Sequence, residues 1–558
     1  MKAREGDIPE ISHAAATMVR SSVGLVPAIV RSAGVSLSRF ASFCLVCVSA
    51  ALLIHSFPPN DTGILVWVAL VPLFLALDGR SRATSFLFSW LLGTLFCIGI
   101  GSWVAVAVLG FANLDLILPG LALGLYYGLF GLGLAHCRFT TQVPLVMAAP
   151  VLWVTMEFVR SQMGMLELPW GLLSHTQYQN LPIIQVASVT GTYGVSCLIV
   201  LVNAFLADML LWLAGRRGPA VSGSTVTRYA VVVGTAVTMT YAYGLFSLSK
   251  NTSQEQMVVT VIQGNIPADL KSDPSYRVAN TRKHIALSQQ ANRQQHAGLI
   301  AWPELAIQGH LSQDLRLLKE VSQMAKDINS SFVIGTSQRP KASPVRVSGV
   351  KKLNSAYLIS SQGDLIGRYH KMRLFPFGEY LPYKNDVPWP TRYAAWDDTV
   401  PGIDQTLLSI EGVPFASLIC WEPIFPDFVR TFVRGGARFI VNISDEAWFG
   451  DTQAPYQILS MNVFRAVENG IVIVRAANTG LSVFIDPHGR ITGRVTAQGK
   501  ELFVEGFLTQ RVSLLREHTW YTSYGDVFAY GLMGGMVMLM AVPYIQRLRS
   551  LRTHRGHP

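Results

Sequence analysis

Charged side chains are scarce in this chain of 558 residues: they make up 14% of it, and its mean hydropathy is +0.34. A soluble protein usually carries about a quarter charged residues. Because long stretches of the sequence have ordinary polar composition, the deficit must be concentrated in segments that never meet water. We therefore predict a membrane protein.

Cysteine is also rare, with six in the chain. Five of them lie in or beside apolar segments, where cysteine is a small hydrophobe: Cys44, Cys47, Cys97, Cys137 and Cys197. Cys420 stands alone in the polar part of the chain. It has no partner for a disulfide within its own domain, so its thiol is either a buried bystander or a nucleophile.

Eight apolar stretches are long enough to cross a hydrocarbon core, which takes about 20 residues per helix. They cover residues 39–57, 63–78, 84–109, 115–135, 142–160, 183–214, 229–249 and 526–545. Between the seventh and the eighth lies the only large polar segment, which has the size of one domain. The chain is expected to be a multi-pass α-helical membrane protein with one globular domain.

Basic residues mark alternate ends of these stretches, and they account for the net charge of +11. They are Lys2, Arg4, Arg20, Arg31 and Arg39 before the first stretch, Arg80 and Arg82 after the second, Arg138 after the fourth, Arg216, Arg217 and Arg228 after the sixth, and Arg547, Arg549, Arg552 and Arg555 after the eighth. Cytoplasmic loops carry such an excess, so both termini are expected in the cytoplasm and the large domain outside it. With no basic-aromatic module present, we expect no nucleic-acid partner.

The expected organisation has five parts. They are a cytoplasmic N-terminal extension (1–38), a seven-helix membrane domain (39–250), a periplasmic domain (257–508), an eighth membrane helix (526–545) and a basic cytoplasmic tail (546–558). The extension is rich in Arg, Ser and Ala, and its apolar run at 25–30 is too short for a secretory signal.

Within 257–508, short β-branched runs alternate with helical stretches, which is typical of α/β layers. Strands are expected at 257–262, 298–302, 332–335, 355–360, 415–420, 439–443, 471–476 and 482–486, and helices at 278–292, 312–329, 423–434 and 455–469. Active sites of α/β folds lie where strands end. Glu304, Lys371 and Cys420 each follow an expected strand.

These three side chains make chemical sense together. A thiol becomes a nucleophile when a base takes its proton or a cation lowers its pKa. Glu304 could be that base, and Lys371 could stabilise both a thiolate and an oxyanion. Each residue alone also has an ordinary interpretation: a glutamate beside a helix N-terminus, a solvated lysine and a core cysteine.

The order of the motifs Trp302-Pro-Glu304, Lys371 with Pro376-Phe-Gly-Glu-Tyr-Leu-Pro382, and Cys420-Trp-Glu422 resembles the nitrilase (carbon–nitrogen hydrolase) superfamily. The resemblance implies an α-β-β-α sandwich with Glu304, Lys371 and Cys420 as catalytic triad and Glu379 as a second glutamate.

Further motifs resemble the apolipoprotein N-acyltransferase family, which joins such a domain to eight membrane helices. They are Leu168-Pro-Trp-Gly171, Gly191-Thr-Tyr-Gly-Val-Ser196, Asn203-Ala204, Gln263-Gly-Asn-Ile-Pro267, Trp448-Phe-Gly450, Arg475-Ala-Ala-Asn-Thr-Gly480 and Tyr524-Gly-Asp526. The resemblance implies transfer of an acyl chain from a phospholipid, through a Cys420 thioester, to the amino group of a diacylglyceryl apolipoprotein in the bacterial inner membrane. We expect no metal and no cofactor.

Supporting roles are less determined. Asn354 and Arg465 are expected to join the site loops, on resemblance only. Glu422 could orient Lys371 or donate to an intermediate, and its ordinary alternative is a structural ion pair. Apolar gates are expected from Trp421, Trp448, Phe377 and Tyr380, although aromatic residues are more often core than lid. Ser444-Asp-Glu-Ala-Trp448 departs from the more usual Ser-Asn-Asp-Ala-Trp and adds negative charge beside a presumed substrate loop.

Two alternatives compete with an acyltransferase. A membrane-tethered amidase or nitrile-type hydrolase would use the same triad with water as acceptor, but a tether needs only one helix. A non-enzymatic lipid-binding protein would require a broken triad, and here all three residues are present.

Overall fold

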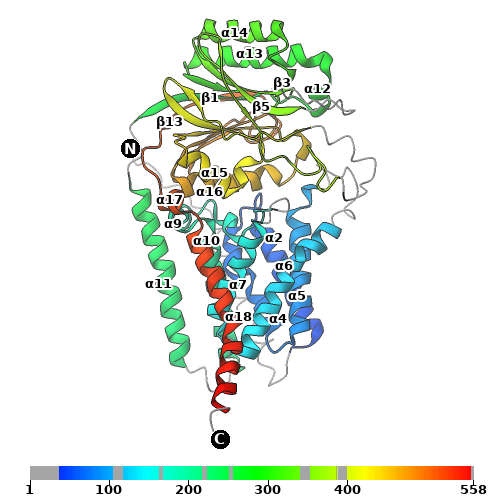
Figure 1. Ribbon diagram of the computed structural model, residues 1–558, viewed down its shortest axis with the longest axis vertical. Helices are drawn as coiled ribbons and strands as arrows, with labels where there is room; N and C mark the ends of the chain where they lie inside the picture. Colours follow the sequence, from blue (N-terminus) through cyan, green and yellow to red (C-terminus); the bar gives the residue numbers. More distant parts are fainter. Residues whose placement is uncertain are drawn as a thin grey trace, which may run out of the picture.

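The computed structural model describes residues 37–104, 117–141, 143–162, 167–216, 223–250, 255–339, 352–384, 386 and 399–554. Most of the N-terminal extension expected at 1–38 lies outside these residues. A bundle of apolar helices forms one end of the molecule, and a two-sheet domain forms the other (Figure 1).

Within the described ranges, five helices are long and apolar enough to cross a membrane: α2 (Arg39–Ser56), α5 (Arg82–Ile100), α6 (Ile117–His136) with its continuation to Thr140, α10 (Thr192–Leu213) and α11 (Gly223–Leu248). Shorter apolar helical stretches cover Gly63–Leu77, Leu181–Thr190 and Val527–Ala541, the last within α18 (Val527–His554). The helix α7 (Leu145–Arg160) also belongs to the bundle and contains Pro150. Every apolar stretch of the sequence is thus largely helical where it is described.

Two of the expected spans are broken. The stretch at 183–214 is divided into α8 (Leu181–Ile184), α9 (Ala187–Thr190) and α10, with Gly191 at a φ of +64° before α10. Glycine takes this left-handed conformation without the steric penalty of other residues. The stretch at 63–78 is likewise divided into η1 (Gly63–Leu65), α3 (Val66–Ala69) and α4 (Val71–Leu77).

Glu157 and Arg160 depart from our expectation. Their position at the end of an apolar segment favoured snorkelling to the interface, but both side chains are 1% exposed. Glu157 accepts hydrogen bonds from the Trp153 indole (3.0 Å) and from the backbone N–H of Leu173 (2.9 Å). The snorkelling interpretation was wrong because these partners hold the carboxylate inside the bundle.

The polar domain contains two sheets. One has the strand order β13-β1-β2-β4-β5-β6, with β3 beside β4, and the other has the order β12-β11-β10-β9-β8-β7. The first sheet comprises β1 (Gln256–Gln263), β2 (Leu299–Ala301), β3 (Ile307–His310), β4 (Ser331–Gln338), β5 (Leu353–Ile359), β6 (Leu365–His370) and β13 (Gly506–Ser513). The second comprises β7 (Leu408–Ile410), β8 (Val413–Ile419), β9 (Ile440–Ser444), β10 (Ile473–Ala477), β11 (Val483–Ile485) and β12 (Ile491–Arg494).

The two sheets pack face to face between helices, giving four layers (Figure 1). Along β5, Ala356 and Leu358 face the core between the sheets, whereas Tyr357 and Ile359 face the outer helices. This alternation follows from the period of two in a strand. The outer helices are α13 (Arg277–Gln294) and α14 (Leu315–Ile328); α15 (Pro426–Arg434) and α16 (Ala454–Asn469) lie between the second sheet and the bundle.

Side chains of α16 complete the ends of two membrane helices. Gln453, just before α16, donates to the backbone oxygens of Gly99 (2.9 Å) and Ile100 (3.0 Å), where α5 ends. Glu468 accepts from the backbone N–H of Thr192 (2.9 Å), where α10 begins. Helix ends leave such groups without intrahelical partners, so these bonds tie the layer that contains α16 to the bundle.

Candidate active site

The three candidate catalytic residues come together from both sheets. Glu304 follows β2 and Lys371 follows β6 in one sheet, whereas Cys420 follows β8 in the other. The site therefore lies where the two sheets meet. Cys420 has a φ of +59°, and Leu305, next to Glu304, has a φ of +49°. Such values are uncommon for residues with a side chain and are concentrated at functional sites.

Lys371 lies between two carboxylates. Its ammonium is 3.2 Å from Glu304 Oε1 and 2.8 Å from Glu379 Oε2, and the residue is 1% exposed. Burial alone would lower the pKa of this lysine, but Cys420, Glu304 and Glu379 raise it well above its usual value. Lys371 is therefore a fixed positive charge in the site.

The Glu304 carboxylate accepts from three donors. Oε1 accepts from Asn354 Nδ2 (2.7 Å) and from the Lys371 ammonium, and Oε2 accepts from the backbone N–H of Asp445 (2.9 Å). The Cys420 thiol lines the same cavity as this carboxylate, whose charge raises the pKa of the thiol. A carboxylate held in this way can serve as the base for the thiol proton.

The Cys420 thiol stays protonated at rest. Burial and the Glu304 carboxylate raise the pKa of the thiol well above its usual value, and the Lys371 charge acts in the opposite direction. The attacking form must then arise during the reaction, with Glu304 taking the proton as sulfur attacks. The geometry fits general-base activation better than a resting thiolate–cation pair.

Asn354 and Glu379 hold Glu304 and Lys371 in place. The amide of Asn354 bridges Glu304 Oε1 and Glu379 Oε1 (3.0 Å), and its backbone oxygen accepts from the N–H of Lys371 (2.8 Å). Glu379 also accepts from the N–H of Phe375 (2.8 Å). Both residues lie where the sequence predicted supporting roles.

The contacts of Glu422 match neither the orienting of Lys371 nor the structural ion pair that we expected. Its carboxylate accepts from Tyr369 Oη (2.8 Å) and from the backbone N–H groups of Met372 (2.7 Å) and Ile419 (2.7 Å). It makes no ion pair among the described residues and does not contact the Lys371 amine. Burial raises the pKa of this carboxyl to about 7, against the effect of its hydrogen bonds. Glu422 thus clamps the loop after Lys371 to the end of β8.

A cavity of about 140 Å³ lies in front of the triad. Besides the triad, its walls include Asn354, Glu379, Phe375, Trp448 and Phe449. Trp448, one of the residues expected to form a gate, is 53% exposed and lines the cavity. Trp421 is 5% exposed, donates to the backbone oxygen of Arg373 (2.6 Å) and packs on Phe375. We expected Trp421 as a lid candidate, but its burial makes it a packing residue behind the cavity wall.

The cavity wall is continuous with the membrane bundle. The Phe449 ring lies edge-on to Trp103 at a centroid distance of 5.1 Å, and Trp103 lies 4.8 Å from Trp170. Trp103 follows α5, and Trp170 lies in the segment between α7 and α10. A buried row of aromatic side chains therefore packs the wall of the cavity against the bundle.

The two acidic residues that depart from the usual motif are buried and paired. Asp445 forms an ion pair with Lys271, and Glu446 forms one with Arg475. These two ion pairs therefore neutralise the negative charge that we expected beside the substrate loop. Lys271 was missed by the sequence analysis, because a single lysine after the Gln263–Pro267 motif gives no signal of its own.

Gly335 carries a further constraint that the sequence did not reveal. A Cβ atom added to Gly335 would lie 2.2 Å from the backbone oxygen of Pro303 and 2.7 Å from the Cα of Glu304. Only glycine lets β4 approach the Glu304 loop this closely.

Among the described residues, no group of three or more His, Cys, Asp or Glu side chains is placed to hold a metal ion.

Comparison with known proteins gives two matching family models. Residues 49–205 match the apolipoprotein N-acyltransferase N-terminal domain, and residues 258–514 match carbon–nitrogen hydrolase. An apolipoprotein N-acyltransferase of Geobacter metallireducens is 33% identical over 509 residues, which cover 90% of this chain and 95% of the relative. The enzyme of that name from Chlorobaculum tepidum is 28% identical, over 91% of this chain and 98% of its own. A mutant Nesterenkonia amidase from the nitrilase superfamily aligns with a TM-score of 0.36 and 20% identity, over 49% of this chain and 95% of its own.

A carbon–nitrogen hydrolase domain carried on apolar helices defines a membrane enzyme of the nitrilase superfamily. The relatives match along nearly the whole length of both chains, membrane half included. This chain belongs to the apolipoprotein N-acyltransferase family.

Proposed function

We propose that this enzyme transfers an acyl chain from a phospholipid to the N-terminal amino group of a diacylglyceryl apolipoprotein. The first half-reaction begins when Cys420 Sγ attacks the sn-1 ester carbonyl and Glu304 takes the thiol proton. A carbon–sulfur bond forms, the ester carbon–oxygen bond breaks, and Glu304 returns the proton to the leaving alkoxide. The products are a thioester on Cys420 and a lysophospholipid.

The second half-reaction uses the same groups in reverse order. The neutral amine of the lipoprotein attacks the thioester carbonyl, a carbon–nitrogen bond forms, and the carbon–sulfur bond breaks. Glu304 accepts a proton from the amine and returns one to the departing sulfur. Lys371 stabilises the oxyanion in both halves because its buried ammonium keeps its charge.

One observation carries this proposal: Cys420, Glu304 and Lys371 line one cavity, whose wall packs through Phe449 onto Trp103 of the membrane bundle. A hydrolase with a soluble substrate needs no cavity beside the bundle. An enzyme whose donor and acceptor are both lipids does, because each must reach the thiol from the bilayer.

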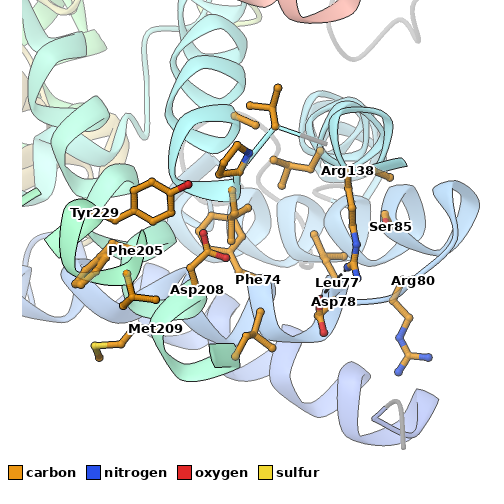
Figure 2. Close-up of a pocket in the computed structure, with 18 residues that line it drawn as sticks. Phe74, Leu77, Asp78, Arg80, Ser85, Arg138, Phe205, Asp208, Met209 and Tyr229 are labelled. Atoms are coloured by element: carbon orange, nitrogen blue, oxygen red, sulfur yellow. Dashed lines mark ion pairs between the residues drawn. The ribbon is translucent and has the colours of Figure 1, made fainter. Parts of the chain in front are cut away.

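The proposal includes a topology with eight membrane helices, both termini in the cytoplasm and the catalytic domain on the periplasmic side of the inner membrane. Supporting it, Arg80, Arg138 and Arg216, which are among the described basic residues that set the orientation, lie at the end of the bundle away from the catalytic domain. There, Arg80 and Arg138 line a cavity of about 270 Å³ (Figure 2). Asp78 pairs with Arg138 (2.9 Å) and with Arg216 (3.3 Å).

Protease added to sealed cells with a permeabilised outer envelope should cut within 257–508 and spare tags on both termini. Protection of the domain until the inner membrane is broken would overturn the orientation.

The chemistry is tested by withholding the acceptor. Purified enzyme given phospholipid alone should bind about one acyl chain per molecule, as a ping-pong enzyme does. Neutral hydroxylamine should release the chain, and a diacylglyceryl-cysteine peptide should receive it as an amide. A Cys420→Ala variant should take up none. Rapid loss of the chain to water, with none reaching the peptide, would favour the tethered hydrolase instead.

A further inference from the structure

A second lysine lies buried behind the triad. Lys271, in α12 (Ala268–Ser272), is 4% exposed. Its ammonium donates to the backbone oxygen of Glu304 (2.6 Å) and forms an ion pair with Asp445. A buried ammonium costs several kcal/mol unless it is paired and hydrogen-bonded. A lysine retained at this depth, touching the main chain of the base, needs an explanation that the two half-reactions do not supply.

Asp445 extends the connection to the carboxylate of Glu304. Its backbone N–H donates to Glu304 Oε2, and its side chain accepts from Asn478 Nδ2 (3.1 Å) in addition to pairing with Lys271. The pair thus binds Glu304 at two points, the main-chain oxygen and the carboxylate. Asp445 also borders the active-site cavity and begins the loop that carries Trp448.

We propose that Lys271 is a positioning residue, which, with Asp445, fixes Glu304 against the Cys420 thiol and balances the charge behind it. The inference rests on the proposed function, in which Glu304 is the base. It concerns a feature of this chain in particular, because the more usual motif has a neutral Asn at position 445. Here the carboxylate of Asp445 pairs with the Lys271 ammonium, which also donates to the main chain of Glu304.

The sign of the electrostatic effect follows from the charges around the thiol. Glu304, Lys371 and Glu379 face Cys420 directly, and the Lys271–Asp445 pair lies behind Glu304. Removing the charge of Lys271 leaves the negative Asp445, which disfavours the Cys420 thiolate. Removing the charge of Asp445 leaves the positive Lys271, which favours the thiolate. Removing both charges should cancel the two effects.

The experiment measures the rate at which iodoacetamide alkylates Cys420 in the full-length enzyme between pH 7 and 10, followed by mass spectrometry of the peptide that contains Cys420. Only the thiolate reacts, so at a fixed pH the rate reports the thiolate fraction. Lys271→Met should lower that rate about 3- to 10-fold, and Asp445→Asn should raise it by a similar factor. Lys271→Met/Asp445→Asn should return to within about twofold of wild type.

A second measurement reports positioning. The single-turnover rate of Cys420 acylation should fall in both variants that lack Lys271, because the Glu304 main chain loses its donor in each. The double variant should therefore combine a near-normal alkylation rate with slow acylation. A purely structural lysine would not separate the two readouts.

Opposite shifts in the two single variants, with recovery in the double, support the inference. Equal alkylation rates in all four proteins, or shifts of the same sign in both single variants, overturn it. If Lys271→Met does not fold, Asp445→Asn and the double variant decide the matter by the same comparison. Alkylation does not depend on acyl transfer, so a wild-type enzyme that forms no thioester would refute the proposed function and leave this test standing.

Discussion

Replacing Glu304 with Gln is the perturbation that tests the base most directly. The change keeps the shape of the side chain and removes its charge and one acceptor group. In the wild-type site the carboxylate accepts from three donors: Asn354, Lys371 and the N–H of Asp445. A Gln amide can accept at its oxygen only, so its NH₂ group must face at least one of these donors.

The magnitude follows in two parts. Loss of the general base should slow thioester formation about 10²- to 10⁴-fold, which corresponds to roughly 3–5 kcal/mol in the activation barrier. Each donor that faces the NH₂ group loses a buried partner, at about 1–3 kcal/mol in the free energy of unfolding. The variant should therefore fold with a lower melting temperature and acylate very slowly.

Residual activity should depend steeply on pH. Without the base, acylation requires the thiolate, and the pKa of the Cys420 thiol lies above its usual value. The thiolate fraction then rises about tenfold per pH unit through the neutral and mildly alkaline range. The loss relative to wild type should accordingly shrink as the pH is raised.

The assay is single-turnover acylation of purified enzyme by radiolabelled phospholipid in micelles, at several pH values, with folding checked by thermal melting. Glu501→Gln is the matched control, because it removes a carboxylate paired with Arg494 (2.7 Å) on the same domain and outside the site. The control should acylate at the wild-type rate. Near-normal acylation by Glu304→Gln at neutral pH would refute the assignment of Glu304 as base.

Three further predictions follow from the site. Lys371→Arg should slow thioester formation at least about tenfold, because a larger planar cation does not fit a space bounded by two carboxylates; a wild-type single-turnover rate would count against Lys371 as the oxyanion partner. Gly335→Ala should displace the Glu304 loop, lowering the free energy of unfolding by about 1–3 kcal/mol and slowing acylation. Gly298→Ala is its control and should do neither, because its Cβ would have no neighbour nearer than 3.9 Å. Thermal melts and acylation rates compare the two variants, and equal behaviour would contradict the steric argument. In the wild-type enzyme, the alkylation rate of Cys420 should rise with every step from pH 8 to 10, because burial keeps its thiol protonated. The rate of free cysteine, with a pKa of about 8.5, levels off over this range. A plateau of the Cys420 rate below pH 9 would contradict the raised pKa.

Much of the catalytic domain could be predicted because its central strands are short, apolar and clearly bounded. All eight expected strands are present within a few residues of their predicted ends, and so are the four helices. A strand before Lys371 was also expected, without stated ends, and it is present as β6. The strands missed were β3, β7, β12 and β13. Of these, β3, β7 and β12 span only three or four residues, too few for an alternating pattern to register.

The positions of the site residues were predictable one strand end at a time, but their assembly was not. Nothing in the sequence says that Cys420 belongs to a different sheet from Glu304 and Lys371, since strand order depends on long-range pairing. The role of Glu422 was also hidden, because its partners are mostly backbone N–H groups, which have no sequence signature. Gly191 had been counted inside one long span, although its φ of +64° divides that span.

The bonds between α16 and the bundle have a consequence for the order of synthesis. The carbonyl groups that end α5 and the N–H group that begins α10 are made early, yet their partners at Gln453 and Glu468 are made more than 250 residues later. A ribosome adds about 5–20 residues per second, so these polar groups wait tens of seconds at the membrane surface. The first helices therefore cannot complete their own ends, and the bundle reaches its final form only when the catalytic domain closes over it.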